Sequence, residues 1–166
     1  MQYRINLYRH CPQNRYRFAL GKMSADPLLY LGLNPSIGDD ALPNRTVQRV
    51  MHFAKREGFD GFILLNLSAQ RALTPPELHR RQNRAMMSEN HQTIAEIFTQ
   101  INMPKMVLGY GNNIELRPYL MASFEKIMAH FRAAKGEAFY LGSLTKAGHP
   151  RHPLYLANDA PLNRWK

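Results

Sequence analysis

Runs of almost uninterrupted apolar residues are the feature of this sequence that most constrains its fold. Residues 28–33 (LLYLGL) and 62–67 (FILLNL) are of this kind, and residues 105–109 and 137–141 are shorter examples. A strand that is apolar along its whole length, rather than at every second residue, belongs in a sheet whose two faces are both covered. We therefore expect these four segments to form a mostly parallel sheet buried between helices.

Amphipathic helices are predicted between these strands. In residues 46–57 the apolar residues Val47, Val50, Met51 and Ala54 are three and four positions apart, a spacing that places them on one face of a helix. Two further helices are expected over residues 88–101 and 114–134. Alternation of strands and helices predicts the α/β class, here a three-layer α/β/α sandwich around a four-stranded sheet.

The residues before the first apolar run have a weaker pattern. Residues 3–20 alternate weakly between apolar and polar side chains on either side of residues 12–14 (PQN), which predicts a small N-terminal antiparallel hairpin. A chain of 166 residues is long enough for one hydrophobic core and too short for two ordinary domains. We therefore expect a single domain over residues 1–166.

Composition excludes several classes of protein. No apolar run approaches the roughly 20 residues of a membrane-spanning helix, and the first residues have no apolar signal-peptide core. The single cysteine, Cys11, allows no internal disulfide and no metal site built from cysteines alone. The dinucleotide and Walker patterns are absent as well. We expect a cytoplasmic protein that needs no cofactor or metal and does not contact a membrane.

The charge of the chain favours a polyanionic partner. Lysine and arginine number 22 against 12 acidic residues, which gives a net charge of +10, and 15 of the 22 are arginine. The arginine guanidinium binds phosphate oxygens through two N–H groups at once, so nucleic acid is the expected partner. A high net charge that serves only solubility is the alternative explanation. Candidate contacts to nucleic acid are Arg71, Arg80, Arg81, Arg84, Lys146 and Arg151.

Polar residues follow the first predicted strand, where ligands bind in sheets of this class. Asn34 stands beside Pro35 and Ser36, and its amide could hold a water or a sugar oxygen, or bond its own turn. Asp39 and Asp40 are candidate catalytic bases, or signals for the start of the next helix.

Four other positions complete the candidate site. Asn66 interrupts the second apolar run, so its amide either pairs with the edge of a base or bonds a neighbouring strand. His149 and His152, separated by proline and arginine, suit stabilisation of a developing anion better than metal binding, or bond the backbone of their loop. Gly109 begins a GYG sequence that is too short to identify a phosphate loop.

The ordered set of these motifs resembles the uracil-DNA glycosylase superfamily. The matching segments are LGLNPS (31–36), LLN (64–66), VLGYG (107–111) and GHPRHPL (148–154). The segments RYRFAL (15–20), LNPS (33–36), NLSAQRALTP (66–75) and GHPRHPLYL (148–156) give a closer similarity over roughly residues 15–156. In these the chain resembles a bacterial and phage family, the domain of unknown function 1643 family.

The glycosylase resemblance implies a role for each motif. Asn34 would orient the attacking water, Asn66 would read the flipped base, and His152, or else His149, would stabilise the departing base anion. Leu154 would fill the vacated base stack. Pro35, Ser36 and Gly109 would line the substrate site, with the small Ser36 leaving room for a modified pyrimidine.

The resemblance therefore predicts hydrolysis of the N-glycosidic bond of a flipped pyrimidine in DNA. The turn of the main branch of that superfamily carries a carboxylate where this chain has Asn34. Two alternatives remain, of which the first is favoured by this difference and the second would not need the net charge. One is a module that binds nucleic acid or a nucleotide without turnover, and the other is a hydrolase or transferase of free nucleosides or nucleotides.

Overall fold

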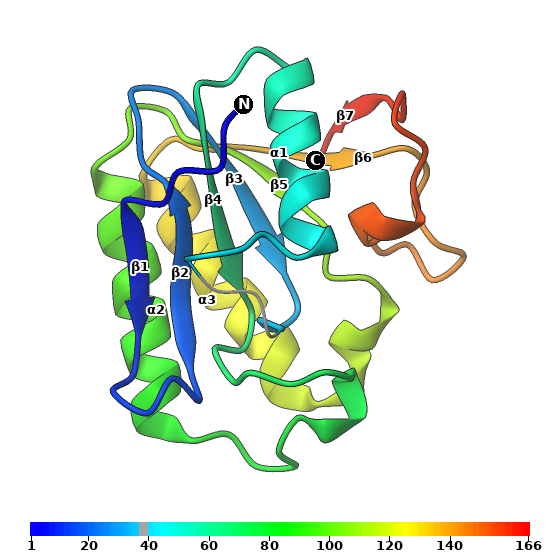
Figure 1. Ribbon diagram of the computed structural model, residues 1–166. Coiled ribbons are helices and arrows are strands. Elements are labelled where there is room, and N and C mark those ends of the chain that lie inside the picture. Colours follow the sequence, from blue (N-terminus) through cyan, green and yellow to red (C-terminus); the bar gives the residue numbers. More distant parts are fainter. Residues whose placement is uncertain (37–39) are drawn as a thin grey trace.

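The computed structural model describes residues 1–36 and 40–166 (Figure 1). The described part of the chain forms a mixed α/β fold with one seven-stranded sheet and three α-helices. The helices are α1 (Arg45–Arg56), α2 (Arg84–Thr99) and α3 (Pro118–Ala133). The strands are β1 (Leu7–His10), β2 (Arg17–Lys22), β3 (Pro27–Gly32), β4 (Gly61–Asn66), β5 (Lys105–Leu108), β6 (Glu137–Leu141) and β7 (Leu162–Arg164).

The sheet is larger than the four strands predicted. Its order is β1-β2-β4-β3-β5-β6-β7, and the four expected strands form its parallel centre. The predicted hairpin, β1 and β2, joins one edge of this sheet, because β2 pairs antiparallel with β4. β7 joins β6 at the other edge and was not predicted, since three residues with the sequence LNR show no apolar pattern.

Two apolar cores fill the space on the two faces of the sheet. Leu29, Leu31 and Leu65 point to the face covered by α2 and α3, and Leu28 and Leu64 point to the face covered by α1. Figure 1 shows α1 in front of the sheet and the other two helices behind it. This two-sided burial explains why β3 and β4 are apolar throughout.

The starts of the helices follow local chemistry. The Asn44 side chain accepts the N–H of Val47 at the start of α1, and Asn83 accepts that of Met86 at the start of α2. The predicted helix over 114–134 is divided: residues 112–116 form a 3₁₀ turn, and α3 begins at Pro118. The proline disfavours helical backbone at the residue before it, and this prevents one continuous helix.

The connections place the reversal of strand order beside β3. The chain leaves β3 through α1 to β4 on one side, and leaves β4 through α2 to β5 on the other side of β3. The helices after β3 and β4 therefore cover opposite faces, and the connections that leave the carboxyl ends of the two strands diverge at this point. In open α/β sheets this is where ligands bind.

A buried tyrosine lies on the α1 face at this reversal. Tyr30 is 3% exposed and donates its hydroxyl to the carbonyl of Gly109, 3.0 Å away. A Cβ at Gly109 would lie 2.5 Å from the Tyr30 ring, and a Cβ at Gly32 would lie 3.0 Å from it. The two glycines thus make room for the ring across the ends of β3 and β5.

No helix among the described residues is long and apolar enough to cross a membrane.

Replacement of Gly109 with alanine tests this packing. We expect Gly109→Ala to lower the free energy of unfolding by about 1–3 kcal/mol, because the added methyl group overlaps the Tyr30 ring. Urea unfolding measures the change. In a Tyr30→Leu background the same substitution should cost clearly less, since the ring is gone. An equal cost in both backgrounds would show that the ring does not limit this position.

Candidate functional site

A cavity of about 620 Å³ lies at the carboxyl ends of β3 and β4, on the face covered by α1. Its wall comes from parts of the chain that are distant in sequence: Arg17, the end of β3 with the turn 33–36, the start of α1, the end of β4, residues 72–75, residues 110–113 and the loop 145–155. The volume is in the range of small-molecule and cofactor sites. The predicted convergence of the carboxyl ends therefore produces a real hollow.

Asn66 presents an unpartnered amide to this cavity. The residue is 5% exposed and lines the wall, and its side chain forms no hydrogen bond with any residue that the structure describes. Its backbone carbonyl accepts the side-chain N–H of Asn90 on α2 at 2.9 Å, which holds the end of β4 in place. A buried amide without a protein partner is costly, so a ligand that pairs with it would bind favourably.

Asn34 lies in the same wall with its orientation fixed. Its Nδ2 donates to the carbonyl oxygens of Ala72 and Pro35 at 3.0 and 3.1 Å. The bond to Pro35 agrees with the interpretation of Asn34 as an amide that bonds its own turn. Because both bonds use Nδ2, the oxygen Oδ1 is the end of the amide that remains available. Among the described residues nothing donates to its Oδ1, which is therefore the acceptor that Asn34 can offer to a ligand.

His152 is a neutral donor at the cavity. Burial lowers the pKa of His152 to about 4 from its usual 6.5, so the ring is uncharged at neutral pH. Its Nδ1 accepts the backbone N–H of Leu154 at 3.3 Å. The proton of a neutral ring must then be on Nε2, and Nε2 forms no hydrogen bond with the described residues. The available atom of His152 is thus an N–H donor.

His149 is placed differently. Its Nε2 lies 2.7 Å from the Glu115 carboxylate, and its backbone N–H bonds the Thr145 hydroxyl. Its ring packs edge-on against the Tyr110 ring, with 6.1 Å between the ring centroids. The residue is absent from the lining of the cavity. Of the two candidate histidines, the structure brings only His152 to the site.

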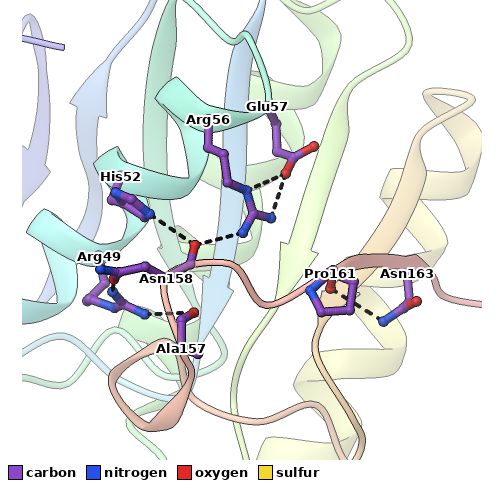
Figure 2. Close-up of polar contacts among 8 residues, drawn as sticks. All are labelled: Arg49, His52, Arg56, Glu57, Ala157, Asn158, Pro161 and Asn163. Atoms are coloured by element: carbon purple, nitrogen blue, oxygen red, sulfur yellow. Dashed lines mark hydrogen bonds and ion pairs between the residues drawn. The ribbon is translucent and has the colours of Figure 1, made fainter.

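One face of α1 holds the segment that carries His152. Arg49 donates to the carbonyl oxygens of Pro153, Leu156 and Ala157 at 3.2, 2.6 and 3.3 Å, and also to the side-chain oxygen of Asn158. Figure 2 shows the side chains of α1 that reach Ala157 and Asn158. The carbonyl of Asn158 accepts from two further residues of α1, His52 at 3.1 Å and Arg56 at 2.9 Å.

The described lining of the cavity is basic. Arg17, which is 2% exposed, lines it together with Arg45 and Arg151, and no aspartate or glutamate is among the described lining residues. Arg151 also donates its Nε to the Ser143 carbonyl at 3.1 Å. Such a lining attracts anionic or electron-rich ligands.

Of the other residues predicted to bind substrate or to act as catalytic bases, only some line the cavity. Ser36 and Leu154 line the cavity, and Leu154 is 41% exposed. Pro35 and Gly109 are not among the lining residues. Asp40 is exposed and does not line the cavity, and Asp39 lies outside the described residues.

The predicted nucleic-acid contacts are mostly outside the cavity. Arg71 bonds the Ser36 carbonyl at 2.9 Å and the Tyr8 hydroxyl at 2.7 Å, and so supports the turn that carries Ser36. Arg84 is the exposed first residue of α2. Three others are exposed and do not line the cavity, namely Arg80, Arg81 and Lys146.

Several lining residues were not identified from the sequence. Tyr30 belongs to the first apolar run and Tyr110 to the GYG sequence, and neither was named as a site residue. Both are buried, and both line the cavity. Burial raises the pKa of both phenols above their usual range, so both remain protonated. Arg17 had a signal that could have been used, since it is a charge next to the apolar sequence FAL in a strand.

No group of three or more histidine, cysteine, aspartate or glutamate side chains within residues 1–36 and 40–166 is arranged to hold a metal ion.

The pKa of His152 predicts a dependence of stability on pH. In the unfolded chain this histidine becomes protonated below pH 6.5, whereas in the folded chain it stays neutral until about pH 4. Between these values protons bind more strongly to the unfolded chain, so the free energy of unfolding decreases as the pH falls. The slope from one such group is at most ~1.4 kcal/mol per pH unit. Burial gives His91 the same shift.

Urea unfolding between pH 7 and pH 4.5 checks this expectation. The variant His152→Gln should lose less stability than the natural chain, whereas His79→Gln, at an exposed position, should follow the natural curve. Parallel curves for His152→Gln and the natural chain would contradict the prediction.

The contacts of Arg49 predict that α1 orders the segment 153–158. Arg49→Ala removes the donors to its carbonyls, so amide hydrogen exchange there should become about tenfold faster, as for the loss of one or two hydrogen bonds. Arg45→Ala on the same helix is the matched control, because the Arg45 side chain bonds none of the described residues. Unchanged exchange in Arg49→Ala would refute the ordering role.

Comparison with known proteins identifies the family. Residues 15–154 match the model of the family described as "Protein of unknown function (DUF1643)". The chain therefore belongs to this family. No curated protein and no solved structure matches it.

Proposed function

We propose that this protein is a DNA base N-glycosylase-like enzyme that takes a flipped base into the cavity and hydrolyses its N-glycosidic bond. The observation that carries the proposal is the Asn66 side chain, which is buried in the wall and bonds none of the residues that the structure describes. An amide offers a donor and an acceptor side by side, and this pair matches the hydrogen-bonding edge of a base.

His152 supports the chemical step. When the bond between sugar and base breaks, the electron pair goes to the base, which leaves as an anion. The Nε2–H of neutral His152 can donate a hydrogen bond to this anion as its charge develops. A neutral donor is sufficient for this role, because it stabilises charge without having to transfer its proton.

Asn34 supports the other half of the reaction. A water must add its oxygen to the sugar carbon that the base leaves, and must release a proton that finally balances the departing base. The fixed Asn34 amide offers its Oδ1 to a hydrogen of this water. An amide oxygen orients water but is too weak a base to deprotonate it fully, so we expect slow turnover.

The charge of the chain supports DNA as the carrier of the base. A net charge of +10 favours the phosphate backbone. A base inside a duplex must leave the stack before it can enter a cavity of this kind, and the exposed Leu154 at the cavity could occupy the space that it leaves.

A second candidate function is binding without turnover. The observation that favours it is the lack of a carboxylate among the described residues of the wall, since hydrolysis is helped by a base that activates water. In that case the cavity would bind a base or nucleotide, again with the base against Asn66, and would leave its N-glycosidic bond intact.

Detection of abasic sites tests the choice. The chain is incubated with oligonucleotides that carry uracil, thymine, cytosine or 5-modified pyrimidines, and strand cleavage by alkali reports the abasic product. We expect excision of at least one base, with loss of activity in Asn66→Ala and His152→Gln. His149→Gln is the matched control and should keep activity, because His149 does not line the cavity.

Other results of this assay decide against hydrolysis in DNA. Binding of the same oligonucleotides without excision, when Asn66→Ala weakens the binding, would favour the binding module. Release of base from free nucleosides or nucleotides alone would favour an enzyme that acts on small substrates.

A further inference from the structure

The amino end of α1 is part of the cavity. Asn44, Arg45 and Thr46 all line it, and they are the cap and the first two residues of a twelve-residue helix. The Asn44 Nδ2 donates to the Ser36 hydroxyl at 2.6 Å, so the start of the helix is tied to the turn that follows β3. This end of α1 is therefore held against the site.

Two backbone N–H groups at this end remain available. The side-chain oxygen of Asn44 accepts the N–H of Val47 at 2.9 Å, and its carbonyl accepts that of Gln48 at 3.0 Å. The N–H groups of Arg45 and Thr46 bond no residue that the structure describes. Unpaired N–H groups at the positive end of a helix are suited to an oxyanion.

The charges in the first turn are the reverse of what an isolated helix favours. The first turn contains no acidic residue and begins with Arg45, although a cation at the positive end of a helix is destabilising. Arg45 is exposed and its side chain bonds none of the described residues. A bound anion would offset this repulsion and would pair with the guanidinium at the same time.

A second, independent observation points to a ligand in the same cavity. The Asn66 amide, 5% exposed and without a protein partner among the described residues, lines the wall together with the helix end. The cavity thus contains one group suited to a base edge and one group suited to an oxyanion. At about 620 Å³ it can hold both parts of a nucleotide.

We propose that the amino end of α1 is a phosphate subsite, in which the N–H groups of Arg45 and Thr46 and the Arg45 guanidinium bind the phosphate attached to the nucleoside whose base contacts Asn66. The inference rests on the proposed function for the base and adds the class of ligand. The ligand is a nucleotide unit, whether free or within a strand, and not an uncharged nucleoside.

Binding measurements with small ligands test the subsite without any requirement for catalysis. Isothermal titration at low salt compares deoxyuridine and deoxycytidine with their 5′- and 3′-monophosphates. We expect a monophosphate to bind about tenfold more tightly than its nucleoside, the size of one charge-assisted hydrogen bond. Arg45→Gln should remove most of this preference and leave nucleoside affinity unchanged.

The matched control is Arg132→Gln, which removes the same charge from an exposed position in the last turn of α3 and should keep the preference. Loss of the preference in both variants would show that net charge alone is responsible and would overturn the subsite. Equal affinity of the natural chain for nucleoside and nucleotide would also overturn it, while leaving the base site intact.

Inorganic pyrophosphate separates the subsite from the proposed function. It should shift the backbone amide resonances of Arg45 and Thr46 in the natural chain and in Asn66→Ala, but not in Arg45→Gln. If pyrophosphate binds in this way and no nucleoside binds, the base site fails and the anion subsite stands. Pyrophosphate shifts that are spread over the exposed arginines, and absent from Arg45 and Thr46, would overturn the subsite.

Discussion

The packing of Tyr30 across the ends of two strands is the constraint on which the rest of the site depends. Its ring occupies the space left by Gly32 and Gly109, and its hydroxyl bonds the Gly109 carbonyl. The sheet order reverses at β3. Tyr30 therefore fills the space between the strand ends at the point where the connecting helices go to opposite faces. The Asn66 amide, close to Gly32, borders the cavity beside it.

α1 connects this strand end to the rest of the wall. Its buried side packs on β3 and β4 through residues such as Val47 and Val50. Arg49 holds the carbonyls of the segment after His152, and the amino end of the same helix faces the cavity. One helix therefore sets the distance between a histidine donor and the backbone N–H groups of Arg45 and Thr46, which bond none of the described residues. Loops alone would not keep this distance constant.

The proposed chemistry divides the wall into two kinds of group. Asn66 and the Nε2–H of His152 suit a base, first as a neutral ring and then as a departing anion. The amino end of α1 and the basic lining suit a phosphate. The groups suited to the base depend on burial, because a low local dielectric strengthens hydrogen bonds and keeps His152 neutral. The same burial makes an empty site costly, and this favours occupation by a ligand.

The sequence by itself determined the parallel centre of the sheet, its helices and the strand ends at which polar residues gather, because apolar runs and helical spacing reflect burial that is local along the chain. It also led to Asn34, Asn66 and His152, which all line the cavity. Only the tertiary structure placed His152, and not His149, in the wall of the cavity, because the placement depends on Glu115 and on the fold of the loop. Only the tertiary structure brought Tyr30, Arg17 and the first turn of α1 to the same wall, since no local pattern records which distant segments meet. The short β7 was missed for the same reason, as it exists only through pairing with β6.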